Sequence, residues 1–262
     1  MGQDGGVWWS SLSARRRTLF AGVAALVVAI GVVVVVRAAG SDSPAGTPAQ
    51  DRLGPVVLVP GYGGGQDALR VLAGRIGASG RETRLVSLPG NGTGDLNAQV
   101  AALEQVVGDA PSVDVIGFSA GGVVARLWLA RGGSHRTRRV ITLGSPLHGT
   151  NLAATGGAVV PDACPVACQQ LAPGSSLLAS LAREPVPVPW LSIWTDDDQT
   201  VVPPDSARLE GAVNLRLQEL CPSVHIEHGD LPTDPLSTAV VLRSLGTAAV
   251  TGQLSDVGCP RP

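Results

Sequence analysis

Residues 113–122 read VDVIGFSAGG, and this stretch decides the fold. The apolar run at 113–117 predicts a buried strand, and residues 121–130 predict a helix that follows at once. Between them lies Gly117-Phe118-Ser119-Ala120-Gly121, a serine with a glycine two positions away on each side. A strand-to-helix turn holds such a serine in a strained, accessible position, and the glycines let neighbouring backbone pass close by. The stretch therefore predicts an α/β fold with Ser119 as a nucleophile.

Short apolar runs alternate with helical patterns on both sides of this turn, which predicts a mostly parallel central sheet flanked by helices. The stretch 146–173, with two cysteines and several glycines and prolines, is expected to consist of loops that cover a cleft or form a surface excursion. The expected strands are 56–59, 83–88, 113–117, 140–143, 190–194 and 213–217, and the expected helices are 66–78, 95–107, 121–130 and 238–245.

A serine hydroxyl needs a base, and the chain has four histidines from which to choose it. His135 and His148 fall in loops soon after the serine turn. The pattern at 224–226 predicts a short strand with His225 inside it, and His228 comes just past its end. Loops beyond the carboxyl ends of strands gather catalytic groups in α/β folds, so we expect His228 to be the base.

The carboxylate that orients the base is expected in the run Asp196-Asp197-Asp198, directly after the strand at 190–194. Asp198 stands three positions before Val201, which can pack beneath the loop and hold the acid in place. We therefore expect Asp198 to be the acid, with Asp197 as the alternative.

Two backbone N–H groups are needed to stabilise the oxyanion of an acyl-transfer reaction. Ala120, directly after the nucleophile, supplies one, and Tyr62 in the glycine-rich stretch 60–65 is expected to supply the other. A phosphate-binding loop is the competing interpretation, but no Lys followed by Ser or Thr occurs there. This chemistry needs no cofactor or metal.

The four cysteines, Cys164, Cys168, Cys221 and Cys259, all follow the serine turn. An even number indicates one or two disulfides and an oxidising compartment, with three pairings open. A metal site is less favoured because no histidine lies close to Cys164 and Cys168.

The N-terminal forty residues carry a targeting signal. Three arginines at 15–17 precede the uncharged apolar run 19–36, which approaches the length needed to cross the roughly 30 Å core of a bilayer. We expect residues 1–37 to form a cytoplasmic basic stub and transmembrane signal-anchor. Residues 38–54 would form a flexible linker, and 55–262 a catalytic domain outside the membrane. A cleaved signal, with Ala38 and Ala39 near the cleavage point, would instead give a secreted protein.

Charge argues against a nucleic-acid partner. The formal net charge is −2, and all 19 basic residues are arginines. Arg136, Arg138 and Arg139 form the one cluster within the expected domain, and we expect them in a solvated loop before a strand.

Taken in order, these motifs resemble those of α/β-hydrolase-fold lipases and esterases, in particular the small secreted bacterial lipases, over roughly residues 55–245. The resemblance implies Ser119 as nucleophile, Asp198 as acid and His228 as base, with Tyr62 and Ala120 as oxyanion donors. The resemblance rests on the motifs VLVPGYGG at 57–64, VIGFSAGG at 115–122 and TLGSPLHGT at 142–150, and on the stretches 198–203 and 221–231.

Two departures from this family bear on the shape of the pocket. Phe118 stands where such lipases often have His, and Pro60-Gly61 replaces a frequent His-Gly. The expected function is hydrolysis of carboxylic esters, favouring a lipid ester over a small one, through an acyl-enzyme. The alternatives are an acyltransferase or thioesterase of cell-envelope lipids, or an inactive module that binds lipid or a partner.

Overall fold

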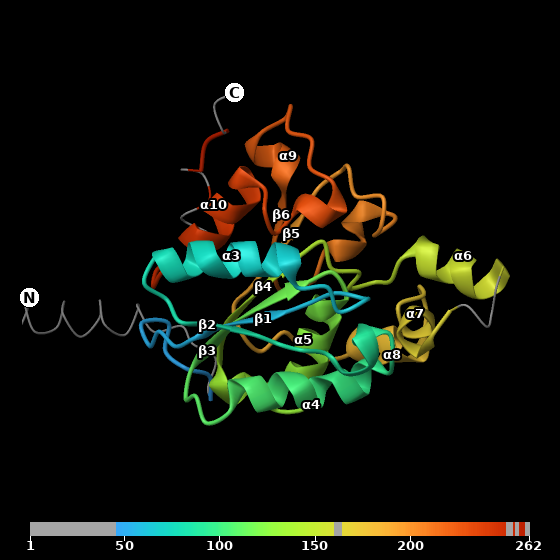
Figure 1. The fold of residues 1–262 in the computed structure, drawn as a ribbon, viewed down its shortest axis with the longest axis horizontal. Helices are drawn as coiled ribbons and strands as arrows, with labels where there is room; N and C mark the ends of the chain where they lie inside the picture. The colour runs from blue at the N-terminus through green and yellow to red at the C-terminus, as the bar shows by residue number, and fades with distance from the viewer. Residues whose placement is uncertain (1–45, 160–163, 250–253, 255–256, 260–262) are drawn as a thin grey trace, which may run out of the picture. The chain divides into compact units, whose positions relative to one another are not determined.

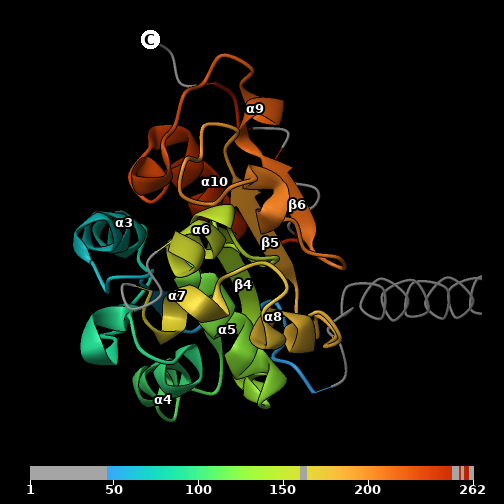
Figure 2. The same cartoon turned by 90° about the vertical axis from the view of Figure 1, so that its right-hand side faces the viewer.

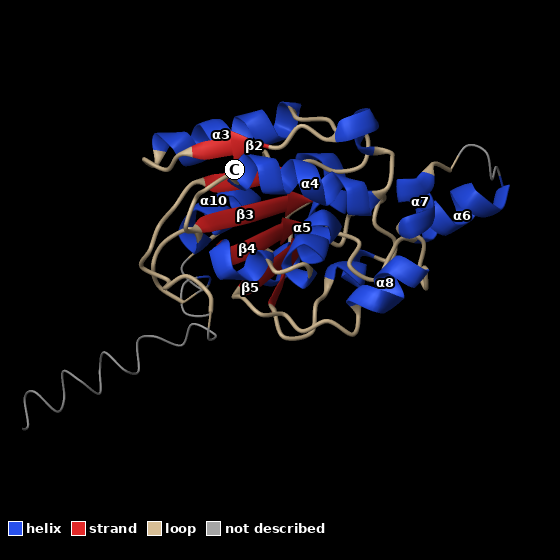
Figure 3. Ribbon diagram, turned by 90° about the horizontal axis from the view of Figure 1, so that it is seen from below, coloured by secondary structure: helices blue, strands red, loops and turns tan. Residues whose placement is uncertain are grey.

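The central element is a six-stranded sheet in which every neighbouring pair is parallel, in the order β2-β1-β3-β4-β5-β6 (Figures 1 and 3). The computed structural model describes residues 46–159, 164–249, 254 and 257–259. The strands are β1 (Val56–Val59), β2 (Thr83–Leu85), β3 (Val113–Phe118), β4 (Thr137–Leu143), β5 (Trp190–Trp194) and β6 (Val213–Arg216). The predicted α/β fold with a parallel sheet is confirmed.

Helices cover both faces of this sheet, as expected (Figures 1 and 2). The helices are α3 (Asp67–Ala78), α4 (Leu96–Val107), α5 (Ala120–Ala130), α6 (Asn151–Val159), α7 (Val166–Gln170), α8 (Ser176–Leu181), α9 (Leu217–Leu220) and α10 (Pro235–Ser244).

Side chains alternate along each strand and so feed two separate apolar cores. In β1, Val56 and Leu58 pack with α3 and α10, whereas Val57 and Val59 pack with α4 and α5. Helix α5 is buried along almost its whole length. The turn that carries Ser119 is thereby fixed between two buried elements.

The stretch 146–173 differs from the prediction of loops alone, because it contains α6 and α7. Helix α6 has the sequence NLAATGGAV, with two adjacent glycines and no charged residue, so its periodicity is weak. It packs mainly against α7 among the described elements. Tertiary contacts with α7 therefore stabilise a helix that the local sequence favours only weakly.

The prediction of a solvated arginine loop is wrong for Arg138 and Arg139, which lie in β4 and are buried. Arg138 donates to both carboxylate oxygens of Asp114 in β3, at 2.7 and 2.6 Å. Its other N–H groups bond to backbone carbonyls, among them those of Gln50 and Leu245. Burial lowers the pKa of Arg139 to about 10, and the charge of Arg138 adds to this shift.

Two disulfides are present, Cys164–Cys168 and Cys221–Cys259, which fixes the pairing that the sequence left open. Disulfides are typical of proteins outside the cytoplasm. The predicted span at 19–36 lies outside the described residues. Within the described part of the chain, no helix is both long and apolar enough to cross a membrane.

Candidate active site

Ser119 occupies the turn between β3 and α5 with φ 53° and ψ −127°, a backbone conformation that non-glycine residues rarely adopt. Two backbone bonds hold the turn. The N–H of Ser119 donates to the carbonyl of Leu143 at the end of β4, at 2.8 Å, and the N–H of Gly122 donates to the carbonyl of Ser119 at 3.0 Å. The strained serine is thus held by the neighbouring strand and the following helix.

The two glycines flanking Ser119 are required by close packing. A Cβ on Gly121 would lie 2.2 Å from the carbonyl oxygen of Val59, and one on Gly117 would lie 2.5 Å from Cα of Gly122. The first turn of α5 can approach β1 this closely because Gly121 has no side chain, and it can lie against the end of β3 because Gly117 has none.

His228 and Asp198 form a buried hydrogen-bonded pair at the carboxyl end of the sheet. Nδ1 of His228 lies 2.7 Å from Oδ2 of Asp198. The other carboxylate oxygen, Oδ1, accepts the backbone N–H groups of Thr200 at 2.9 Å and Val201 at 2.7 Å. Both oxygens are therefore bound, which fixes the carboxylate and orients the imidazole.

Asp197, the alternative acid, lies elsewhere. Its Oδ2 accepts the backbone N–H of Ile226 at 3.3 Å and faces Nδ1 of His225, also at 3.3 Å. The side chain of His225 is 87% exposed. The prediction of a strand at 224–226 is wrong, because these residues belong to an irregular segment that leads into a 3₁₀ turn at His228–Asp230.

Ser119 follows Phe118, which contacts the imidazole of His228, although within the described residues no hydrogen bond joins the Ser119 hydroxyl to His228. The ring of Phe118 lies 5.1 Å from the imidazole of His228, centroid to centroid. Gly144, with φ 55°, directly follows β4, and a Cβ there would lie 3.0 Å from both Asp198 Oδ2 and His228 Nδ1. The contacts made by Phe118 and Gly144 were not predicted, because both depend on neighbours distant in sequence.

The two predicted oxyanion donors border the same site. The N–H of Ala120 is the first of α5, and neither it nor the N–H of Tyr62 donates to an acceptor within the described residues. The loop of Tyr62 lies against the nucleophile, since a Cβ on Gly61 would be 2.8 Å from Cβ of Ser119. Free N–H groups at a helix N-terminus favour negative charge, which suits a developing oxyanion.

A cavity of about 190 Å³ opens beside Ser119. Its lining is mainly apolar, and much of it comes from the stretch 146–171. The lining residues are Tyr62, Ser119, Pro146, Thr150, Leu152, Ala153, Cys168, Leu171, Thr200 and Val201. An apolar cavity next to a serine can hold the hydrocarbon part of a substrate. Within the described residues, no cluster of three or more His, Cys, Asp or Glu side chains is placed to hold a metal ion.

No family model matches this sequence, and no curated protein matches it. Solved structures do match the fold. A lipase B from Aspergillus fumigatus has a TM-score of 0.66 at 20% identity, over 83% of this chain and 59% of that one. A bromoperoxidase from Bacillus anthracis has a TM-score of 0.54 at 14% identity, over 75% of this chain and 92% of that one.

The N-formylmaleamic acid deformylase of Pseudomonas putida has a TM-score of 0.51 at 16% identity, over 74% of this chain and 92% of that one. Of the fungal lipase, by contrast, this chain spans less than two thirds of the length. At these identities the likeness concerns the fold, and the chain has the α/β-hydrolase fold that the fungal lipase also has.

Proposed function

We propose that this protein is a serine hydrolase of carboxylic esters that works through an acyl-enzyme. The observation that supports the proposal is the buried hydrogen bond between Asp198 and His228, whose imidazole contacts Phe118, the residue before a strained serine that lines an apolar cavity. In this proposal Ser119 is the nucleophile, His228 the general base and Asp198 the acid that orients it.

The reaction begins when Nε2 of His228 takes the proton of the Ser119 hydroxyl as its oxygen attacks the ester carbonyl. The C=O electron pair moves onto oxygen, where the N–H groups of Tyr62 and Ala120 stabilise it. The intermediate collapses, the bond to the alcohol breaks, and His228 returns the proton to the leaving oxygen. The hydrogen bond from Ser119 to His228 forms as the substrate complex assembles, which is usual for catalytic bonds that are absent in the free protein.

Deacylation repeats these steps with water. His228 removes a proton from water, the hydroxide attacks the acyl carbonyl, and the carboxylic acid leaves as the proton returns to Ser119. Asp198 holds the Nδ1–H tautomer throughout, so that Nε2 faces the reacting atoms. An alcohol or thiol that replaced water would turn the same acyl-enzyme into a transferase, so product analysis with both acceptors is part of the test.

The expected substrates are lipid esters or small esters, since the cavity lining is mainly apolar. The two disulfides favour an extracytoplasmic location. A membrane tether through residues 19–36 belongs to the proposal as well, and it places the site beside lipid.

Labelling with a fluorophosphonate probe tests the nucleophile directly. The full chain should be labelled, and Ser119→Ala should abolish the label. Ser180→Ala, an exposed serine in α8, should leave it intact. Failure of the folded wild-type protein to be labelled would leave the fold as a binding module and overturn the proposal.

A further inference from the structure

We infer that the cavity beside Ser119 selects esters of short acyl groups and that the Cys164–Cys168 disulfide maintains its wall. The inference rests on the proposed function, because the cavity then receives the acyl group of the substrate. It goes further by naming the length of the substrate's acyl group and the element of the protein that limits this length.

Cavity volume sets the length of the acyl group. The cavity measures about 190 Å³, and an apolar protein cavity of about 150 Å³ holds benzene. An acyl chain of about six carbons therefore fits. Further carbons must pass the rim formed by Tyr62 and Leu152, which are 44% and 58% exposed. Beyond this rim a chain meets water and gains no further burial.

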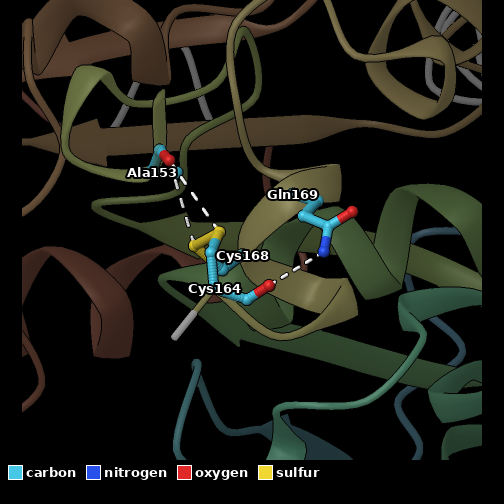
Figure 4. Close-up of a disulfide and its surroundings, with 4 residues drawn as sticks. All are labelled: Ala153, Cys164, Cys168 and Gln169. Atoms are coloured by element: carbon cyan, nitrogen blue, oxygen red, sulfur yellow. Dashed lines mark hydrogen bonds between the residues drawn. A yellow bond between two sulfur atoms is a disulfide. The ribbon is translucent and has the colours of Figure 1, made fainter. Parts of the chain in front are cut away.

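The disulfide joins Cys164 to Cys168 of α7 and lies next to Ala153 of α6 (Figure 4). Each of its sulfur atoms is 3.9 Å from the carbonyl oxygen of Ala153, in the first turn of α6. A disulfide sulfur has no proton to donate, so these are packing contacts. Ala153 and Cys168 both line the cavity. The disulfide thus packs against the first turn of α6, and Cys168 is itself part of the cavity wall.

The rest of the wall is fixed at Thr150 and Leu171. The N–H of Thr150 donates to the carbonyl of Leu171 at 2.9 Å, and its hydroxyl donates to the carbonyl of Thr200 at 2.8 Å. The same hydroxyl accepts the N–H of Val202 at 3.0 Å. These bonds tie the start of α6 and the end of α7 to the loop after Asp198. Among the described elements α6 packs mainly against α7, and the disulfide contacts the first turn of α6.

A p-nitrophenyl ester series from acetate to palmitate, assayed with the full chain, tests the inference. Each buried methylene is worth about fourfold in kcat/KM, so kcat/KM should rise steeply to about the hexanoate ester. It should then level off or fall.

Two variants should move this limit. Leu171→Ala deepens the cavity directly and keeps both disulfides. The double variant Cys164→Ala with Cys168→Ala removes the two sulfur atoms that pack against Ala153 of α6. Each should raise the ratio of kcat/KM for dodecanoate over hexanoate by roughly 15-fold, the value of about two further buried methylenes.

The matched control is Cys221→Ala with Cys259→Ala, which removes the other disulfide. It should lower the midpoint of thermal unfolding and leave the ratio unchanged, because neither residue lines the cavity. A wild-type rise that continues to palmitate overturns the inference, as does an unchanged ratio in both wall variants. In either case, turnover of the acetate ester and labelling of Ser119 would leave the proposed function standing. If the wild-type protein neither hydrolyses the acetate ester nor is labelled at Ser119, the proposed function and the inference are both overturned.

Discussion

Asp198 binds His228 with one carboxylate oxygen and the backbone of its own loop with the other. Oδ2 lies 2.7 Å from Nδ1 of His228, and Oδ1 accepts the N–H groups of Thr200 and Val201 at 2.9 and 2.7 Å. The loop after β5 thereby determines which oxygen faces the imidazole. This division of the two oxygens makes the effect of an amide at position 198 predictable.

Asp198→Asn should lower kcat by about 10³- to 10⁴-fold with little change in stability. The amide oxygen will stay with the N–H groups of Thr200 and Val201, so the amide NH₂ must face Nδ1 of His228. That arrangement favours the opposite imidazole tautomer, with the proton on Nε2, where it cannot accept the serine proton. Steady-state assays on a short ester will measure the loss.

Asp197→Asn is the control for this variant, because Asp197 contacts Ile226 and His225 and does not contact His228. It should keep kcat within a few-fold of wild type. A larger loss of kcat for Asp197→Asn than for Asp198→Asn would show that Asp198 is not the acid.

Gly144→Ala should reduce kcat by at least about tenfold, because misplacing catalytic groups by about 1 Å has large kinetic effects. Its Cβ would lie 2.6 Å from Cδ1 of Leu231 and 3.0 Å from both polar atoms of the Asp198–His228 pair. The comparison is Gly132→Ala, which also has positive φ, 95°, but no neighbour within 4 Å. That variant should lower stability by about 1 kcal/mol through backbone strain and leave kcat unchanged. Equal kcat for the two variants would mean that Gly144 does not position the pair.

The sequence was sufficient to predict elements whose signal is local. The strand at 190–194, the serine turn and the position of Asp198 in the loop after that strand follow from apolar runs and the residues directly after them. The parallel sheet follows from their alternation. Each of these predictions needs only neighbours a few positions away.

Features that depend on distant partners were missed. Arg138 reads as a surface residue until Asp114, 24 positions earlier, is placed beside it in the sheet. Helix α6 has only a weak periodic pattern because it contains two adjacent glycines and no charged residue, and among the described elements it packs mainly against α7. These features depend on strand register and tertiary packing, and the periodicity of the sequence reveals neither.

The Asp114–Arg138 pair supplies a prediction about stability. Asp114→Asn should cost about 3–5 kcal/mol of unfolding free energy, because it leaves a fully buried guanidinium without its countercharge. Urea denaturation will measure this loss. Asp67→Asn, which breaks the exposed pair with Arg70, should produce no measurable change. Similar midpoints for both variants would show that the buried pair does not support the sheet.

The last prediction concerns pH and the segment that carries the cavity wall. Asp95 caps α4, and its Oδ1 accepts from the side chain of Gln170 in α7 at 2.6 Å and from the N–H of Asn97 at 2.8 Å. The hydrogen bond from Gln170, followed by that from Asn97, lowers the pKa of Asp95 below 3.8. A carboxylate whose pKa is lower in the folded state stabilises the fold above the unfolded value. That contribution is lost as pH falls through the folded pKa.

Wild-type protein should therefore be more stable than Asp95→Ala by about 1 kcal/mol at pH 7. The difference should shrink as pH falls below 3.8. Asp95→Ser keeps an uncharged cap, so its advantage over Asp95→Ala should persist at acid pH. Urea unfolding of the three proteins at pH 7, 4 and 3 will measure these differences. A gap between wild type and Asp95→Ala that stays constant across this range would mean that the carboxylate charge contributes nothing to holding α4 and α7 together.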